Sequence, residues 1–202
     1  MDLENFIHDS VVPDVIPIKP KQLILITYPS GVKVQLGNEL TPTQVKDKPT
    51  ATWDAEPNTL YTLIFTDPDA PSRRKGTPGK MFKHWMVVNI PENSLQMGDT
   101  TADYIGAGPP EGTGLHRYCF LLYKQCKRLD SGPMVSSESS SGRMRWELAP
   151  FVQANHLTLV GGNFYQAQYD EYVITMQKKL FGVFYPIFAC LKAIGIVKLL
   201  TT

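Results

Sequence analysis

The chain has 202 residues, of which 43% are hydrophobic, and this length is sufficient to bury the core of one ordinary domain. Twenty Lys and Arg residues against nineteen Asp and Glu residues leave a formal net charge of +1, so no whole-molecule field favours nucleic acid or an anionic membrane. Three cysteines, an odd number without CxxC spacing, argue against a disulfide framework and against a zinc knuckle.

The first 20 residues are punctuated by prolines and lack the basic and apolar regions of a signal peptide. They predict an N-terminal arm that leads into the domain, and the protein is expected to be cytoplasmic. Two runs that flank a Pro-Ser-Gly turn predict a β-hairpin, and core strands are expected where β-branched and aromatic residues gather between Pro and Gly clusters. The hairpin covers 23–28 and 32–36, the core strands cover 60–67, 84–90, 115–123 and 157–165, and helical periodicity appears around 146–155 and from Gln166 onward.

This order of elements, mostly strands with helices late in the chain and no βαβ alternation, predicts an antiparallel β architecture with peripheral helices. No GxGxxG follows a strand and no GxxxxGK[ST] occurs, so we expect no cofactor. HExxH and GxSxG are also absent, and the sequence shows no activated nucleophile, so we expect neither an enzyme nor a metal site. The alternative is a hydrolytic or metal site at Asp67, His84 and His116, which metal analysis and an esterase assay would detect.

Three polar side chains stand at the ends of predicted core strands. Alternate side chains of a strand share one face, so Asp67 ends a row that contains Leu63 and Phe65. The same alternation gives His84 and His116 apolar rows of their own, namely Met86, Val88 and Ile90 for His84, and Tyr118, Phe120 and Leu122 for His116. Polar tips above apolar rows predict a pocket with an apolar floor and a polar mouth.

The groups around this predicted pocket suit a phosphate. Both imidazoles and the Tyr118 hydroxyl can donate hydrogen bonds, and the Gly-rich run 106–114 supplies backbone N–H groups that can form an anion-binding nest. Asp67 can hold a ligand's ammonium group or fix an imidazole tautomer. We therefore expect a ligand that contains phosphate, and a zwitterionic head group would use both charges.

Two segments carry a family resemblance. Residues 66–73 read TDPDAPSR and residues 108–118 read GPPEGTGLHRY, and both resemble the signature segments of the phosphatidylethanolamine-binding (Raf kinase inhibitor) family. Shorter matches at 40–45 and 165–172 extend the resemblance over most of the chain. It implies a mainly β fold with a central antiparallel sheet, a second smaller sheet and peripheral helices. It also implies non-enzymatic binding of phospholipid head groups or other phosphate-containing small molecules, with a signalling role.

The resemblance further implies which residues bind the ligand. They are Asp67, Pro71, His84, Pro109, Pro110, His116, Tyr118 and Tyr172, with Tyr172 closing the pocket from a C-terminal helix. Arg117 has the opposite parity to His116, so we expect it to reach a structural carboxylate or a backbone carbonyl. Asp69 and Arg73 are expected to brace the loop, and Ala70-Pro71 is a candidate cis bond.

The chain departs from the family pattern at two places. It has Phe82-Lys83-His84 after a Gly-rich lead-in at 76–80, which predicts a more basic pocket rim. We also expect a ligand-binding domain over 1–179 and an apolar extension over 180–202, where 180–191 is almost uninterrupted apolar sequence. Pro186 and Lys192 interrupt this run, so it falls short of the roughly 20 apolar residues that a bilayer span needs.

The sequence leaves alternatives open for the extension and for the use of the pocket. The extension could dock on the sheet, associate with a second copy of the chain, or attach to a membrane interface. The pocket could serve inhibition or scaffolding of a kinase or protease, because it could receive a phosphorylated or acidic segment just as it receives a lipid phosphate.

Overall fold

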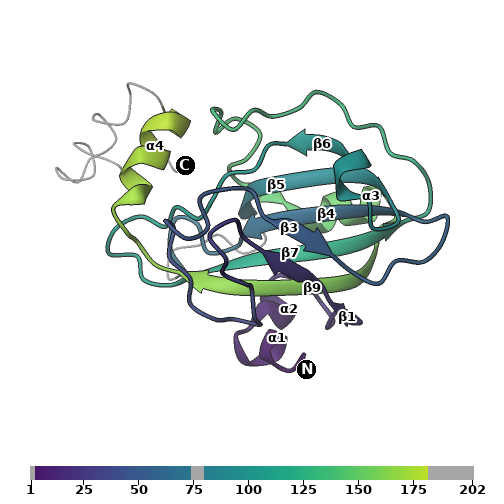
Figure 1. Ribbon diagram of the computed structural model, residues 1–202, viewed down its shortest axis with the longest axis horizontal. Helices are drawn as coiled ribbons and strands as arrows, with labels where there is room; N and C mark the ends of the chain where they lie inside the picture. Colours follow the sequence, from purple (N-terminus) through teal and green to yellow (C-terminus); the bar gives the residue numbers. More distant parts are fainter. Residues whose placement is uncertain (1–2, 74–79, 182–202) are drawn as a thin grey trace.

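The computed structural model describes residues 3–73 and 80–181, which form a large mixed sheet, a small second sheet and short helices (Figure 1). The large sheet has the order β1-β9-β7-β4-β5-β6, with β8 paired to β5, and the second sheet joins β2 and β3. The strands are β1 (Gln22–Leu23), β2 (Leu25–Thr27), β3 (Thr50–Thr52), β4 (Leu60–Asp67), β5 (Lys80–Pro91), β6 (Asp99–Ala102), β7 (His116–Gln125), β8 (Trp146–Glu147) and β9 (Thr158–Ala167). The helices are α1 (Asn5–His8), α2 (Val11–Asp14), the 3-10 turn η1 (Leu95–Met97), α3 (Leu148–Ala154) and α4 (Tyr172–Phe181).

The four predicted core strands form the centre of the large sheet, and their pairing confirms the mainly β prediction. β4 pairs antiparallel with β5 and β7, and β7 pairs antiparallel with β9. At the edge, β1 runs parallel to β9. The predicted strand 23–28 is divided between two sheets, because Leu23 pairs with Gly162 in the large sheet whereas Leu25 pairs with Thr52 in the second.

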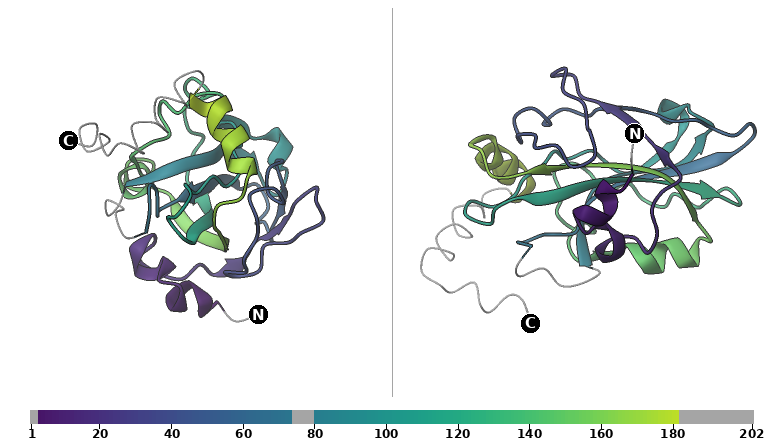
Figure 2. Two further views of the ribbon diagram at one scale, coloured as in Figure 1. Left: turned by 90° about the vertical axis from the view of Figure 1, so that its left-hand side faces the viewer. Right: turned by 90° about the horizontal axis from the view of Figure 1, so that it is seen from below.

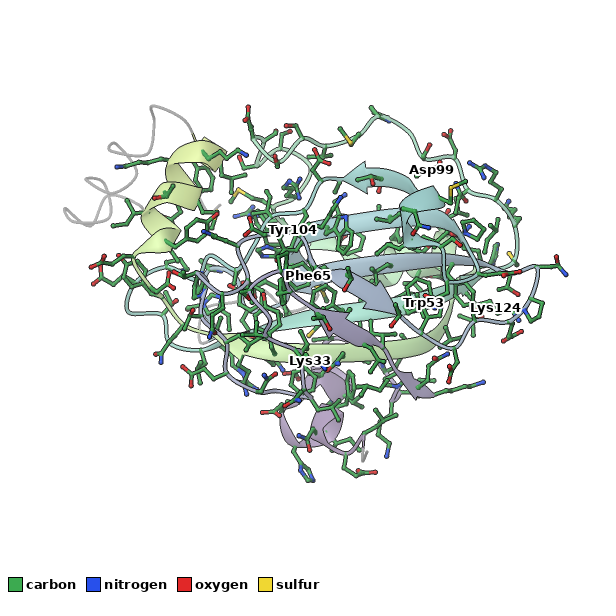
Figure 3. All side chains as sticks on the ribbon, viewed as in Figure 1. Lys33, Trp53, Phe65, Asp99, Tyr104 and Lys124 are labelled. Atoms are coloured by element: carbon green, nitrogen blue, oxygen red, sulfur yellow. The ribbon has the colours of Figure 1, made fainter. Side chains whose placement is uncertain are left out.

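Each face of the large sheet has its own core. On one face the second sheet and the loops around it cover β4, β5, β7 and β9, and the shared core includes Phe65, Phe120 and Tyr165. On the other face α1, α2 and α3 pack on the sheet around Ile64 and Leu121 (Figure 2). Figure 3 places Phe65 near the middle of the sheet, where its ring stacks on Phe120 with centroids 4.1 Å apart. Both faces of β4 are therefore buried.

A β-bulge on β5 changes which side chains share a face. Phe65 pairs with Trp85 but Thr66 pairs with Lys83, so His84 is an additional residue on β5. The bulge directs His84 toward Phe65, with ring centroids 5.2 Å apart. The prediction that His84 shares a face with Met86 and Val88 is therefore wrong, because those two side chains belong to the opposite core.

The same bulge decides the surroundings of Lys83. Its ammonium lies 5.4 Å from the centroid of the Trp146 ring, and the whole residue is 8% exposed. Trp146 packs on the core of the α3 face, away from His84. Lys83 therefore does not make the pocket rim more basic, contrary to the prediction, and residues 74–79 of the Gly-rich lead-in lie outside the described residues.

The C-terminal helix begins later than its periodicity predicted. Gln166 and Ala167 still pair with β7, and the helix starts at Tyr172, where the side chain of Asp170 accepts a hydrogen bond from the Tyr172 amide at 3.0 Å. α4 then continues through Phe181. Residues 182–202 lie outside the described residues, so the docking of the extension stays a prediction. Within 3–73 and 80–181, no helix combines the length and apolar character that crossing a membrane requires.

Candidate functional site

Asp67 and His116 form a buried pair where β4 ends and β7 begins. Asp67 Oδ2 accepts a hydrogen bond from His116 Nδ1 at 2.9 Å, and the two side chains are 5% and 0% exposed. The other ring nitrogen, Nε2, lies 2.9 Å from Thr113 Oγ1, which is itself 2.6 Å from the Pro110 carbonyl oxygen. Because both nitrogens of His116 have partners in the protein, His116 positions its neighbours, and a ligand would have to displace Thr113 to reach it.

His84 has a different hydrogen-bonding state. Nδ1 lies 3.0 Å from the carbonyl oxygen of Ile105, and since a carbonyl can only accept, Nδ1 carries a proton. Burial lowers the pKa of His84 to about 4, and the opposing charge of Asp67 does not cancel this shift. At neutral pH the ring is therefore neutral, and Nε2 presents a lone pair that accepts a hydrogen bond.

Tyr118 supplies the complementary donor. Its ring is fully buried with its centroid 5.3 Å from that of His84, and its hydroxyl accepts a hydrogen bond from the Gly108 amide at 3.2 Å. Burial, followed by the negative charge of Asp67, raises the pKa of Tyr118 well above its ordinary value. The hydroxyl therefore keeps its proton, and the ring that carries this donor packs against the ring of His84.

Asp69 and Arg117 bind each other and hold the loop after β4 in place, as the opposite parity of Arg117 predicted. Asp69 Oδ2 accepts from the backbone amide and from Nε of Arg117, and Oδ1 accepts from Nη2 at 2.7 Å. The guanidinium also donates to Asp14 and to the carbonyl oxygens of Asp9 and Ser10. Arg73 contributes to the same brace by donating to the Asp9 carbonyl at 3.0 Å. The N-terminal arm is thus fixed to the loop that follows β4.

The remaining predicted site residues differ in their burial. Pro71 is exposed and follows a cis peptide bond, as expected, whereas Pro109 is buried and Pro110 is half-buried in the Gly-rich loop. Tyr172 is half-buried on α4. Burial and then the charge of Asp47 raise the pKa of Tyr172.

The side chain that covers Gly108 is Met176, one helical turn after Tyr172. A Cβ added to Gly108 would lie 1.6 Å from the Met176 methyl carbon, so only a glycine allows this contact. Met176 and Leu180 pack on Ile105, whose backbone carbonyl accepts the hydrogen bond from His84. α4 therefore lies across the end of the sheet where β4 and β9 end (Figure 1). Sequence reasoning missed both Met176 and Thr113, although Thr113 stands three residues before His116 inside the quoted motif.

Comparisons with known proteins agree with this geometry. A family model described as phosphatidylethanolamine-binding protein matches residues 30–166. A curated relative named "Putative odorant-binding protein A5", from Drosophila melanogaster, is 32% identical over 175 residues, which cover 86% of this chain and 83% of that protein. The 26 kDa secreted antigen of Toxocara canis is 39% identical over 167 residues, which cover 81% of this chain and 63% of the relative's own length.

Solved structures share the fold. A carboxypeptidase Y inhibitor, crystallised in complex with its cognate proteinase, is 28% identical with a TM-score of 0.69 over 83% of this chain and 95% of that one. A phosphatidylethanolamine-binding protein from Plasmodium falciparum has a TM-score of 0.65 at 22% identity, over 83% of this chain and 97% of that one, which shows the shared fold. With the family model spanning most of the sheet and the signature residues gathered in one place, the chain belongs to the phosphatidylethanolamine-binding protein family.

Proposed function

We propose that the chain is a non-enzymatic binding protein for zwitterionic phosphate head groups such as phosphoethanolamine. The observation that carries the proposal is the buried juxtaposition of a donor, the Tyr118 hydroxyl, with an acceptor, His84 Nε2, in rings 5.3 Å apart. Tyr118 can donate to a phosphate oxygen, while His84 can accept from an ammonium group. The charge of Asp67 favours the same ammonium group. The family match supports a ligand of this class.

The Tyr118 hydroxyl can be tested with one conservative change. Tyr118→Phe keeps the ring and removes the hydroxyl, so the affinity for glycerophosphoethanolamine is expected to fall by roughly tenfold or more, as for a hydrogen bond to a charged group worth about 1.5–3 kcal/mol. Isothermal titration calorimetry measures this loss. Tyr123→Phe is the matched control, because Tyr123 is a buried tyrosine of the same strand in the opposite core. Equal affinities in all three proteins would remove the proposed site.

A second prediction concerns the cover formed by α4. Met176→Ala removes the side chain that lies on Gly108, so glycerophosphoethanolamine is expected to bind several-fold faster, because less of the cover must move. Stopped-flow fluorescence measures the association rate. Ile174→Ala is the control, since Ile174 is on the same helix and is 36% exposed. Unchanged association in Met176→Ala would mean that the ligand enters by another route.

A second candidate function is inhibition of a protease through the same pocket. It is favoured by the solved relative of similar fold that was crystallised in complex with its cognate proteinase. The two functions differ in one observable. If the pocket serves inhibition, glycerophosphoethanolamine should relieve the inhibition of carboxypeptidase Y, and Tyr118→Phe should weaken the inhibition.

A further inference from the structure

Arg143 is a buried cation outside the site proposed for the head group, which lies around Asp67, His84 and Tyr118 and is called the head-group site below. Its side chain is 0% exposed, and no carboxylate in the part of the chain that the structure describes forms an ion pair with it. Burial lowers the pKa of Arg143 to about 10, so the guanidinium keeps its charge at neutral pH. A buried charge is costly unless hydrogen bonds compensate it, so its acceptors show what it holds together.

The guanidinium of Arg143 donates to six backbone carbonyl oxygens. Nη1 donates to the two residues at the β-bulge of β5, at 3.0 Å to Lys83 and 3.1 Å to His84. Nη2 donates at 2.8 Å to Asp103. The other acceptors belong to the loop 135–142 and are the carbonyl oxygens of Val135, Ser136 and Ser139. One planar side chain therefore joins the bulge, the 103–105 segment and the loop.

Two of these three segments determine the orientation of the His84 ring. His84 is the additional residue of the bulge, and its Nδ1 lies 3.0 Å from the carbonyl oxygen of Ile105. The Ile105 amide donates in return to the His84 carbonyl at 2.9 Å, and Arg143 donates to that same carbonyl. The relative position of the bulge and the 103–105 segment thus decides whether Nδ1 reaches its acceptor. Arg143 spans the junction between them.

Arg143 also acts on His84 through its charge. Burial is the main cause of the low pKa of His84, the carboxylate of Asp67 opposes it, and the cation of Arg143 adds to it. Tyr118, whose ring packs on that of His84, stays neutral because burial raises its pKa. The positive charge of Arg143 therefore disfavours a second proton on the ring, and Nε2 remains an acceptor.

We propose that Arg143 is a positioning residue of the head-group site, which holds His84 with Nδ1 on the Ile105 carbonyl and Nε2 free to accept from an ammonium group. This role rests on the proposed function for the identity of the ligand, whereas the orientation of His84 belongs to the free protein. Three of the six acceptors of Arg143 lie in the loop 135–142. The loop thus supports a site for which none of its residues was predicted.

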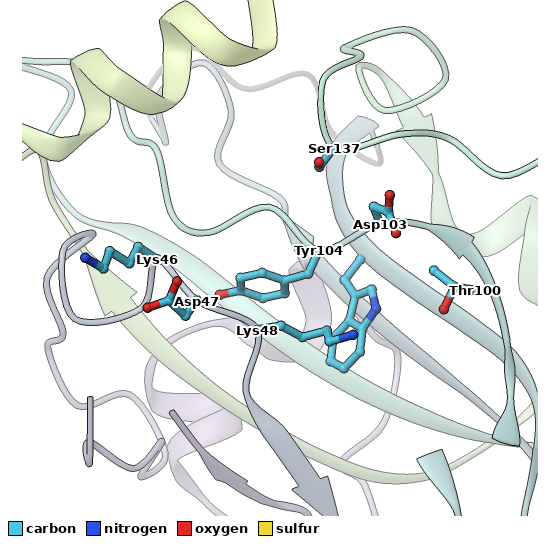
Figure 4. A pocket seen from close by; sticks show the side chains of 8 residues that line it. Lys46, Asp47, Lys48, Thr100, Asp103, Tyr104 and Ser137 are labelled. Atoms are coloured by element: carbon cyan, nitrogen blue, oxygen red, sulfur yellow. The ribbon is translucent and has the colours of Figure 1, made fainter. Parts of the chain in front are cut away.

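The loop contains a side chain that can be changed without removing an acceptor of Arg143. Ser137 and Asp103 both line a cavity of about 280 Å³ beside Tyr104, so the Ser137 side chain faces this cavity (Figure 4). The acceptors that the loop offers to Arg143 are backbone carbonyls of other residues. Ser137→Ala is therefore a control within the loop.

The first test is Arg143→Lys, which keeps the charge but replaces the fork with one nitrogen that cannot span three segments. Ring ¹⁵N NMR spectra of the full chain at pH 7 report which nitrogen of His84 carries the proton. The wild type and Ser137→Ala are expected to show a proton on Nδ1 alone. Arg143→Lys is expected to show a mixture of the two tautomers and to bind glycerophosphoethanolamine at least tenfold more weakly.

His116 is an internal control in the same spectra. Its Nδ1 donates to Asp67 at 2.9 Å and not to a carbonyl that Arg143 holds, so its tautomer should be the same in every variant. An unchanged His84 tautomer in Arg143→Lys would overturn the role of Arg143. A change at both histidines would also contradict it, because Arg143 would then support this end of the sheet in general.

The ligand measurement separates this role from the proposed function. If the wild type does not bind glycerophosphoethanolamine, the proposed function fails, and the His84 tautomer in Arg143→Lys still decides whether Arg143 positions the ring. If the wild type binds it and Arg143→Lys binds it equally well, the proposed function stands and Arg143 is not a positioning residue.

A second pair of variants leaves Arg143 in place, in case Arg143→Lys does not fold. Gly142 has a φ of 73°, and a Cβ there would lie 3.4 Å from a methyl carbon of Val135, so Gly142→Val must shift the backbone that carries Arg143. Gly132 has a φ of 57° and nothing within 4 Å of an added Cβ, so Gly132→Val is the matched control. Gly142→Val is expected to change the His84 tautomer and Gly132→Val is not. Identical His84 signals in these two variants would contradict the proposal.

Discussion

Asp69→Ala is expected to lower the free energy of unfolding by about 3–5 kcal/mol, the cost of removing one partner from a buried ion pair. Asp69 is 2% exposed and accepts three hydrogen bonds from Arg117, which is 3% exposed. Without this carboxylate, the buried guanidinium keeps only Asp14 and the carbonyl oxygens of the N-terminal arm as partners. Urea denaturation of the two proteins measures the difference.

The chain contains a matched control for this prediction. Asp14 also pairs with Arg117, at 2.9 Å, but its side chain is 48% exposed. Asp14→Ala should therefore cost less than about 1 kcal/mol, as is usual for exposed ion pairs. Similar losses for Asp69→Ala and Asp14→Ala would show that burial does not decide the strength of this brace.

His84 is expected to make the fold less stable as the pH falls. Its pKa is about 4 in the folded chain, against an ordinary value of about 6.5 when unfolded. Between these values the unfolded chain binds a proton that the folded chain does not. The contribution of His84 to the free energy of unfolding is therefore fully present above about pH 6.5, declines as the pH falls, and levels off below about pH 4. At about 1.36 kcal/mol for each pH unit, the total loss is about 3 kcal/mol.

The measurement is the unfolding free energy between pH 7 and 4 in the wild type and in His84→Gln. Carboxyl groups titrate in the same range, so the informative quantity is the difference between the two curves, which should shrink by about 3 kcal/mol toward low pH. A curve for His84→Gln that runs parallel to that of the wild type would mean that His84 takes up its proton as readily in the folded chain as in the unfolded chain.

Strand alternation predicted part of the site well and part of it wrongly, and the reason lies in β5. The pairing of β4 with β7 stays regular through Phe65 and Thr66. Phe65 and Tyr118 therefore face the same core, as expected. On β5 the bulge adds one residue, and the period of two fails at His84. A bulge depends on strand pairing across the sheet, which local sequence does not specify.

The cover of the site was also beyond sequence reasoning. The motif that contains Gly108 gives no sign that a methionine 68 residues later will lie on it, because that contact depends on where α4 docks. The periodicity of α4 predicted a helix, and its buried side includes Val173, Met176 and Leu180. Which surface those side chains meet is decided by the tertiary fold.

The attachment of the N-terminal arm has a consequence for biosynthesis. Arg117 holds the Ser10 carbonyl across 107 residues of sequence, and β1 pairs with residues 161 and 162 of β9. The arm leaves the ribosome long before its partners on β9 are made, so it cannot dock until most of the described chain has been synthesised. Until then Phe6 and Val11, both fully buried in the finished protein, remain in water. The nascent chain therefore carries an uncovered apolar segment throughout elongation, which is the kind of surface that chaperones bind.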